Sequence, residues 1–232
     1  MSRLSQQAEV RVAARALAKA GFVHAYGHCS LRLDAEHFLV CAAKPMGLIQ
    51  PGEPGTVVPI RGALPDGVLG EVRIHQQIYQ RRPDVNAVIR SMPMQVMSLS
   101  CAGLTPRLRH GMGAYFHEGV PLWDAPQLLR DDAQAAALAE QLGESQALVM
   151  RGNGAIVIGS SLVEALTLVF YLEDAARIEL QLLAAGLADH APLLSLKEAQ
   201  QRATNSGRIF ERMWDYLTAG DAELNLITRE ER

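Results

Sequence analysis

Two segments of the sequence combine residue types that can move protons and bind anions. Residues 26–30 are YGHCS, which places His28 and Ser30 directly after a glycine. Residues 71–75 are EVRIH, so Glu71 and His75 stand one helical turn apart. Carboxylates and imidazoles serve as general acids and bases, and both are also metal ligands. These residues are the first candidates for a functional site.

Two arginines add a second kind of chemistry. Arg90 ends the apolar run NAVIR, and Arg151 opens the glycine-containing segment RGNG. A pair of guanidinium groups suits the binding of a carboxylate, because each presents a planar fork of donors. The structural alternative is that each arginine simply pairs with Glu71, Asp84 or Glu173.

Glu71 and His75 also have structural interpretations. A carboxylate at the start of a helix favours the helix dipole without any role in chemistry. A histidine among apolar neighbours such as Ile74 and Ile78 is typical of a core residue whose polar atoms are satisfied. The residue types alone leave both alternatives open.

Composition limits the classes of protein that remain. The 232 residues are 49% hydrophobic and 20% charged, with a formal charge of −3, which is ordinary for a globular domain. Nucleic acid or an acidic membrane would require a concentrated basic face, so we expect neither as a partner. Three widely spaced cysteines predict free thiols. The N-terminal segment lacks the apolar core of a signal peptide and no later run is long enough to span a membrane, so a cytoplasmic protein is expected.

The candidate residues must be positioned by alternating helices and strands. Apolar spacing and glycine or proline stops predict a long helix at each end of the main domain, and a hairpin near the candidate loop. The expected helices cover 5–20, 71–82, 94–102, 129–142, 161–185 and 208–217, and the clearest strands cover 29–33, 38–42, 86–90, 147–150 and 155–159. This order favours a layered α/β sandwich with a mixed or mostly antiparallel central sheet flanked by helices. We expect one domain over residues 1–190, with residues 191–232 as a helical extension and polar tail packed on it.

Three motifs together identify a family. The runs GEVRIHQQIYQRRPDVNAVIR, RGNGAIVIG and LEDAARIELQLLAAG, in this order and spacing, resemble the class II aldolase/adducin family over about residues 5–190. The loop HAYGHCSLRL is similar to that family's glycine-containing loop, and its GHxS form is closer to the decarboxylase-like members. The resemblance implies the layered fold described above.

The resemblance also implies a metal site, and this sequence departs from it. Family members hold a divalent metal with three histidines, two on a strand and one in RNHG. Here the acidic residue is kept as Glu71, but the histidine positions are occupied by Arg90, Met92 and Asn153. Arginine has no free lone pair, and methionine and asparagine are poor zinc ligands. A zinc or manganese ion is therefore expected only through an alternative ligand set, namely His28, Glu71, His75 and His110.

The family's site residues carry over to this chain as predictions. Glu71 is the predicted proton carrier. The loop containing His28 and Ser30 is where the family binds the anionic end of its substrate. The tyrosine that assists protonation in the aldolases is replaced by a segment around His110. The predicted substrate-binding residues are therefore His28, Ser30, Arg90, Arg151, Asn153 and His110.

Two functions from different classes follow. The first is a lyase that breaks a carbon–carbon bond of a small carboxylated or oxo-acid substrate, by decarboxylation or retro-aldol cleavage. The second is a noncatalytic ligand-binding or assembly protein, as in the adducin branch. In either case the expected partner is a small anionic metabolite, and the resemblance implies a homotetramer.

Overall fold

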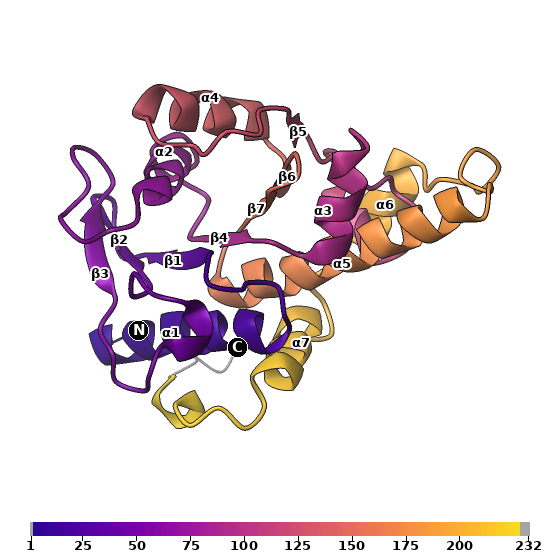
Figure 1. Cartoon of the computed structure of the whole chain (residues 1–232). Helices are drawn as coiled ribbons and strands as arrows, with labels where there is room; N and C mark the ends of the chain where they lie inside the picture. The colour runs from indigo at the N-terminus through magenta and orange to yellow at the C-terminus, as the bar shows by residue number, and fades with distance from the viewer. Residues whose placement is uncertain (1, 228–232) are drawn as a thin grey trace.

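The fold is built on one seven-stranded sheet. The computed structural model describes residues 2–227. The strand order is β3-β2-β1-β4-β7-β6-β5, and every neighbouring pair is antiparallel except β5 and β6, which are parallel. The mixed α/β sandwich predicted from the sequence is confirmed, with β1 and β4 side by side near the middle of the sheet (Figure 1).

Helices cover both faces of the sheet. In Figure 1, α2 and α4 lie above the strands and α1 and α5 lie below them, while α3 packs beside α5. The strands are β1 (His28–Arg32), β2 (His37–Val40), β3 (Thr56–Pro59), β4 (Ala87–Ser91), β5 (Leu122–Trp123), β6 (Ala147–Met150) and β7 (Gly154–Gly159). The helices are α1 (Arg3–Lys19), α2 (Arg73–Arg81), α3 (Met94–Cys101), α4 (Asp132–Leu142), α5 (Leu162–Ala184), α6 (Leu196–Arg202) and α7 (Ile209–Thr218), and the 3-10 turns are η1 (Met46–Leu48), η2 (Gly70–Val72), η3 (Gly113–Phe116) and η4 (Leu224–Leu226).

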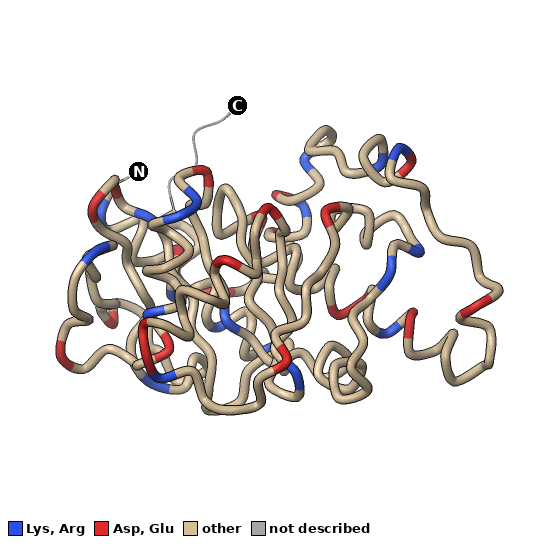
Figure 2. The backbone as a smooth tube through the Cα atoms, turned by 90° about the horizontal axis from the view of Figure 1, so that it is seen from above, with Lys and Arg blue, Asp and Glu red and all other residues tan. Residues whose placement is uncertain are grey.

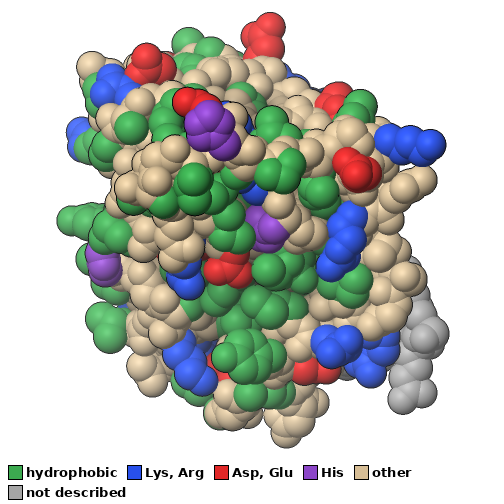
Figure 3. Space-filling view, turned by 90° about the vertical axis from the view of Figure 1, so that its right-hand side faces the viewer, with side chains coloured by type: hydrophobic (Ala, Val, Ile, Leu, Met, Phe, Trp, Pro, Cys, Tyr) green, Lys and Arg blue, Asp and Glu red, His purple; other side chains and the backbone are tan. Residues whose placement is uncertain are grey.

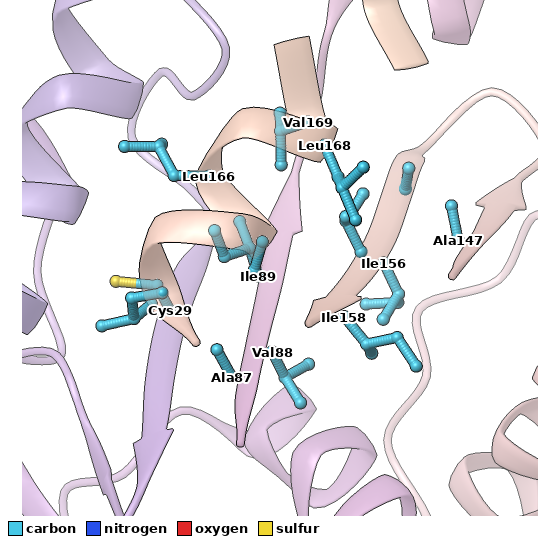
Figure 4. Packing of buried hydrophobic residues seen from close by; sticks show 14 of the residues in the cluster. Cys29, Ala87, Val88, Ile89, Ala147, Ile156, Ile158, Leu166, Leu168 and Val169 are labelled. Atoms are coloured by element: carbon cyan, nitrogen blue, oxygen red, sulfur yellow. The ribbon is translucent and has the colours of Figure 1, made fainter. Parts of the chain in front are cut away.

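The main core lies between the central strands and α5. Ile89 of β4 and Val157 of β7 are fully buried, as are Leu166 and Val169 of α5. Figure 4 shows side chains of β4 beside those of α5 on this side of the sheet. Because successive residues of a strand point to opposite faces, the neighbours of Ile89 point to the other face, where α2 and α4 lie. Arg90 is one of them.

One helix was missed in the sequence. The segment after residue 190 was expected to hold a single helix, but α6 precedes α7 there. Ser195 accepts a hydrogen bond from the backbone N–H of Glu198, and the Glu198 carboxylate accepts one from the backbone N–H of Ser195. This capping box is visible in the sequence as SLKE and would have identified the helix start. The polar tail expected at 229–232 lies outside the described residues.

The C-terminal segment is joined to the main domain by a buried ion-pair cluster. Helix α7 packs on α5 and α1. The Arg11 guanidinium of α1 donates to the Glu223 carboxylate at 2.6 and 2.9 Å, and these side chains are 3% and 4% exposed. Arg15 also donates to Glu223, at 2.8 Å, and to Asp221. These contacts support our proposal that residues 191–232 are an extension of the same domain.

Removing the Glu223 charge is expected to destabilise the fold. Glu223→Gln leaves Arg11 buried without its anion, a change that costs about 3–5 kcal/mol of unfolding free energy. Burial alone would raise the pKa of Glu223, but hydrogen bonds from Arg11, Arg15 and the Gly52 N–H lower this pKa from 4.5 to about 2. Because the folded pKa is lowered, the stabilisation is complete above pH 4.5 and is lost as the pH falls towards 2.

Urea denaturation of wild type, Glu223→Gln and the exposed control Glu36→Gln over pH 2–7 checks this prediction. At pH 7 the free energy of unfolding should be higher for wild type than for Glu223→Gln, and this difference should shrink as the pH falls. The free energy of unfolding of Glu36→Gln should equal that of wild type at every pH. Equal stability of Glu223→Gln and wild type at pH 7 would contradict a structural role for this cluster.

Charged residues are spread over the fold. Figure 2 shows Lys and Arg positions interspersed with Asp and Glu positions along the described chain. Among residues 2–227, no helix combines the length and apolar character needed to cross a bilayer. Because basic and acidic residues are mixed, an anionic ligand must be bound by a few basic or hydrogen-bonding side chains within a single site.

Candidate active site

The first part of the site is one face of β1. His28 and Ser30 are two residues apart and point to the face that α2 covers, while Cys29 between them points to α1 and contacts the Val10 carbonyl. His28 and Ser30 are 2% and 0% exposed. Gly27, just before them, has a positive φ of 99° and its α-carbon lies too close to the Arg90 carbonyl for a β-carbon to fit. The GHCS loop is therefore bent tightly against β4.

The second part of the site is the turn that leads into α2 and the buried face of α2 itself. Glu71 lies in the 3-10 turn η2 that leads into the helix, and His75 and Tyr79 lie on successive turns of the same buried face. The His75 ring is stacked on the Phe38 ring, with 6.3 Å between the ring centroids. The Tyr79 ring packs against the same Phe38 ring, with 5.0 Å between the centroids. The helix thus presents two polar side chains to β1 within an apolar surround.

A continuous line of hydrogen bonds joins α2 to β1. The Tyr79 hydroxyl lies 2.9 Å from Ser30 Oγ, and Ser30 Oγ lies 2.6 Å from His75 Nδ1. His75 Nε2 in turn lies 2.8 Å from His28 Nδ1. The line ends at His28 Nε2, which is 3.9 Å from the nearer carboxylate oxygen of Glu71. We call Tyr79, Ser30, His75 and His28 the buried relay.

Arg90 of β4 completes the site beside Glu71. Strand register places Arg90 directly opposite His28. Its Nη1 donates to the Ser91 carbonyl at 2.9 Å, and its Nε lies 3.4 Å from Glu71 Oε2. The Arg90 side chain is 4% exposed and the Glu71 side chain is 22% exposed. Glu71 is therefore the member of the group that solvent reaches.

Burial keeps both histidines neutral at physiological pH. Loss of solvent, together with the nearby Arg90 charge, lowers the pKa of His75 to about 3. Burial first, then His75 and Arg90, lower the pKa of His28 well below its ordinary value. Burial also lowers the pKa of Arg90, and the Glu71 carboxylate opposes this change. The site therefore contains one carboxylate, one guanidinium and two uncharged imidazoles.

Three buried polar atoms in this group have no hydrogen-bond partner among the described residues: His28 Nε2, Glu71 Oε1 and Arg90 Nε. Buried polar atoms normally find partners. These three belong to side chains that meet at Glu71. Such an arrangement can accept the oxygen atoms of a small polar ligand.

The residues at the family's usual metal positions do not fit a divalent metal. Arg90 has no free lone pair, and Met92 and Asn153 are poor partners for zinc. In the alternative set, both ring nitrogens of His75 are engaged in the buried relay. Within residues 2–227 no group of three or more His, Cys, Asp or Glu side chains is arranged to hold a metal. The described residues therefore do not fit a divalent metal at either set of positions.

The predicted residues outside this group lie elsewhere. Arg151, in the turn between β6 and β7, forms an ion pair with Asp124, and the Asn153 backbone closes the same turn by donating to the Met150 carbonyl. His110 lies over Gly113, and burial lowers its pKa more than the Asp174 carboxylate raises it. Among the described residues, no hydrogen bond or ion pair joins these three to Glu71.

Of the structural alternatives for the arginines, the part of the chain that the structure describes contains only the Arg90–Glu71 pair. Asp84 pairs with Arg82, and Glu173 instead accepts hydrogen bonds from the backbone N–H groups of Gln95 and Val96 at the start of α3. Arg151 pairs with none of the three partners named in its structural alternative, because the β6–β7 turn places it beside Asp124.

Tyr79 is the member of the site that the sequence did not single out. The signal was its spacing, four residues after His75, which places two polar side chains on one face of a helix.

Comparison with known proteins places the fold in a family. Residues 8–180 match the model of the class II aldolase and adducin N-terminal domain. The chain is 30% identical over 196 residues to 3,4-dihydroxyphthalate decarboxylase of Terrabacter sp. strain DBF63, covering 76% of this chain and 79% of that protein. An aldolase II superfamily protein from Pseudomonas syringae superposes with a TM-score of 0.76 at 25% identity, over 94% of this chain and 92% of that one. L-fuculose-1-phosphate aldolase from Thermus thermophilus superposes with a TM-score of 0.70 at 26% identity, over 83% of this chain and 100% of that one.

Proposed function

This chain belongs to the family of class II aldolase and adducin N-terminal domains, and from that membership we propose that it is a carbon–carbon lyase acting on small carboxylated or oxo-acid substrates. One similar protein is named a dihydroxyphthalate decarboxylase and another is named a sugar-phosphate aldolase. Both reactions break a carbon–carbon bond and leave its electron pair on the carbon that stays. Decarboxylation is the preferred alternative, since the decarboxylase is the more similar in sequence.

The observation that supports this proposal is the position of the Glu71 carboxylate. It lies between the Arg90 guanidinium, at 3.4 Å, and the His28 ring, at 3.9 Å. A carboxylate that solvent reaches can exchange protons with water, and the adjacent guanidinium supplies a fixed positive charge where a metal acts in other family members. A site with these two groups can stabilise an anion and move a proton.

In a decarboxylation, the electron pair of the breaking bond moves from the carboxylate carbon into the neighbouring carbonyl system of the substrate. Carbon dioxide leaves, and an enolate oxygen with negative charge is formed. Arg90 stabilises that oxygen, because a preorganised cation in a buried site interacts strongly with developing charge. Glu71 takes a proton from solvent and delivers it to the carbon, which leaves Glu71 as a carboxylate again. One proton is consumed for each carbon dioxide released.

In a retro-aldol cleavage the same two groups suffice. Glu71 removes the proton of the hydroxyl group beside the bond that breaks, and that carbon leaves as an aldehyde. The electron pair again forms an enolate, which Arg90 stabilises, and Glu71 returns its proton to the enolate carbon. No net proton is consumed, so the two reactions are distinguished by their products and by proton uptake.

We also propose that the active form is a homo-oligomer with a small anionic metabolite as its ligand. Two cavities lined by described residues lie away from Glu71: one of 160 Å³ lies between α1 and the end of α7, and one of 380 Å³ is lined by Tyr115, Tyr171 and Arg202. Figure 3 views the side of the molecule on which α3, α5 and α6 lie, where hydrophobic side chains alternate with Lys and Arg. In the proposed oligomer, a second copy encloses the site around Glu71.

A substrate panel tests the proposed function. Wild-type protein is incubated with hydroxylated aromatic carboxylates, β-oxo acids and hydroxy-oxo acids, and carbon dioxide and aldehyde are measured. Release of either product from at least one compound is expected. A compound that binds tightly but is recovered unchanged, with no product from any other, would favour the noncatalytic binding protein and contradict the lyase.

A further inference from the structure

The buried relay has a direction, and its start is fixed at Tyr79. The Tyr79 hydroxyl has two acceptors, the Asn86 carbonyl at 3.5 Å and Ser30 Oγ at 2.9 Å. The Asn86 carbonyl already accepts a hydrogen bond of 2.7 Å from the Arg32 N–H. The shorter contact to Ser30 is the better hydrogen bond, so Tyr79 donates to Ser30.

The remaining donors follow in turn. Because Ser30 Oγ accepts from Tyr79, its own proton is free for His75 Nδ1, at the short distance of 2.6 Å. His75 must then have its proton on Nε2, because a neutral imidazole has one donor and one acceptor nitrogen. That proton is donated to His28 Nδ1 at 2.8 Å. His28 in turn has its proton on Nε2, the atom nearest Glu71.

The opposite direction is disfavoured at the Glu71 end. It would leave His28 Nε2 as a bare lone pair facing a carboxylate oxygen 3.9 Å away, so that two acceptors would face each other. It would also require Tyr79 to donate to the long, already occupied Asn86 carbonyl. The packing of Tyr79 between Phe38 and the Arg32 guanidinium, which lies 4.7 Å from the ring centroid, holds the hydroxyl in place.

We propose that Tyr79 and Ser30 are positioning residues that hold His28 in the Nε2–H tautomer, so that His28 is a neutral hydrogen-bond donor at the site. This inference rests on the proposed lyase function for its chemical use. His28 Nε2–H donates to the same substrate oxygen that Arg90 stabilises, and the proton stays on the imidazole throughout. A neutral imidazole suits this role because its N–H is only weakly acidic. Next to the Arg90 cation, the ring neither gives up this proton nor competes with Glu71 for another.

The tautomers can be measured without substrate. Long-range ¹H–¹⁵N spectra of protein labelled at histidine report which ring nitrogen is protonated, and His28→Gln and His75→Gln spectra assign the signals. We expect wild-type His28 and His75 to be Nε2–H. Tyr79→Phe removes the donor that orients Ser30, and Ser30→Ala removes the donor to His75 Nδ1, so a mixture of tautomers at both histidines is expected in each variant. The control is Tyr216→Phe, which makes the same change at an exposed position and should leave the spectra unchanged.

Kinetics on the substrate found by the panel provides the second readout. Tyr79→Phe is expected to lower kcat by roughly 10- to 100-fold, as for other outer partners of a functional imidazole, with KM nearly unchanged. Wild-type His28 protonated on Nδ1, or tautomers that Tyr79→Phe and Ser30→Ala leave unchanged, would overturn the inference. If the histidines have the predicted tautomers but the protein transforms no substrate, the buried relay is supported and only the proposed function is contradicted.

Discussion

Replacing Glu71 by glutamine is expected to lower kcat by roughly 100- to 10,000-fold, the range for loss of a general acid or base. Glutamine keeps the size of the side chain, and its amide oxygen can face Arg90 as the carboxylate does, but it cannot accept or release a proton. The change should therefore fall mainly on kcat and not on KM. Product formation measured over a range of substrate concentrations gives both constants.

Two variants control this experiment. Glu140→Gln makes the same change at an exposed position of α4 and should keep wild-type activity. Glu71→Asp keeps the carboxylate but shortens its reach, so an intermediate rate is expected. Circular dichroism at the assay temperature establishes that each variant is folded. Activity of Glu71→Gln equal to that of wild type would exclude Glu71 as the proton carrier.

Replacing Arg90 by methionine is expected to lower kcat/KM by roughly 100- to 1,000-fold, as for removal of one group that stabilises a developing anion. Methionine fills a similar volume without charge. Because the Glu71 side chain is 22% exposed, water can replace Arg90 as its partner, and the melting temperature should change little. Loss of activity at unchanged stability would then be due to the missing charge.

The matched control for this prediction is Arg81→Met, on the exposed side of α2, which should retain wild-type activity. Arg90→Lys keeps the charge but not the planar fork, and we expect it to recover part of the lost activity. If Arg90→Met bound and transformed the substrate as wild type does, the anion would have to be stabilised elsewhere, and Arg151 would be the next candidate.

The sequence was sufficient for the family and for most elements of the fold. The class II aldolase/adducin resemblance is confirmed by the family match over residues 8–180. The hairpin that presents His28 and the helix that presents His75 were both predicted, because local spacing of apolar residues determines them. The first turn of the latter helix differs: residues 70–72 form a 3-10 turn, and the α-helix begins at Arg73.

The contacts within the site could not be predicted from local pattern. His28 meets His75 because β1 pairs with β4 in a register that places His28 opposite Arg90, and α2 crosses that face. Register and crossing depend on the packing of the whole sheet. The two interpretations of His75 also prove compatible, since it is fully buried with both nitrogens bonded and is still linked to His28.

The positions of Arg151, Asn153 and His110, which lie away from Glu71, also depend on the packing of the whole fold. Arg151 and Asn153 are close to the site in family motifs, but the β6–β7 turn directs the Arg151 side chain to Asp124. The sequence groups His110 with the site from its segment alone, whereas its ring lies over Gly113 of η3 and the Asp174 carboxylate that raises its pKa is on α5. Their roles in substrate binding remain predictions.

The most direct test of this account is the rate of the metal-depleted protein. Wild type is treated with chelator, its zinc and manganese contents are measured by elemental analysis, and its rate of product release is compared with that of untreated protein. Since Arg90 supplies the positive charge at the site, we predict an unchanged rate at a metal content far below one ion per chain. Loss of activity that one equivalent of zinc or manganese restores, and that Glu71→Gln or His28→Gln protein does not recover, would contradict the account and indicate a metal site built on these two residues.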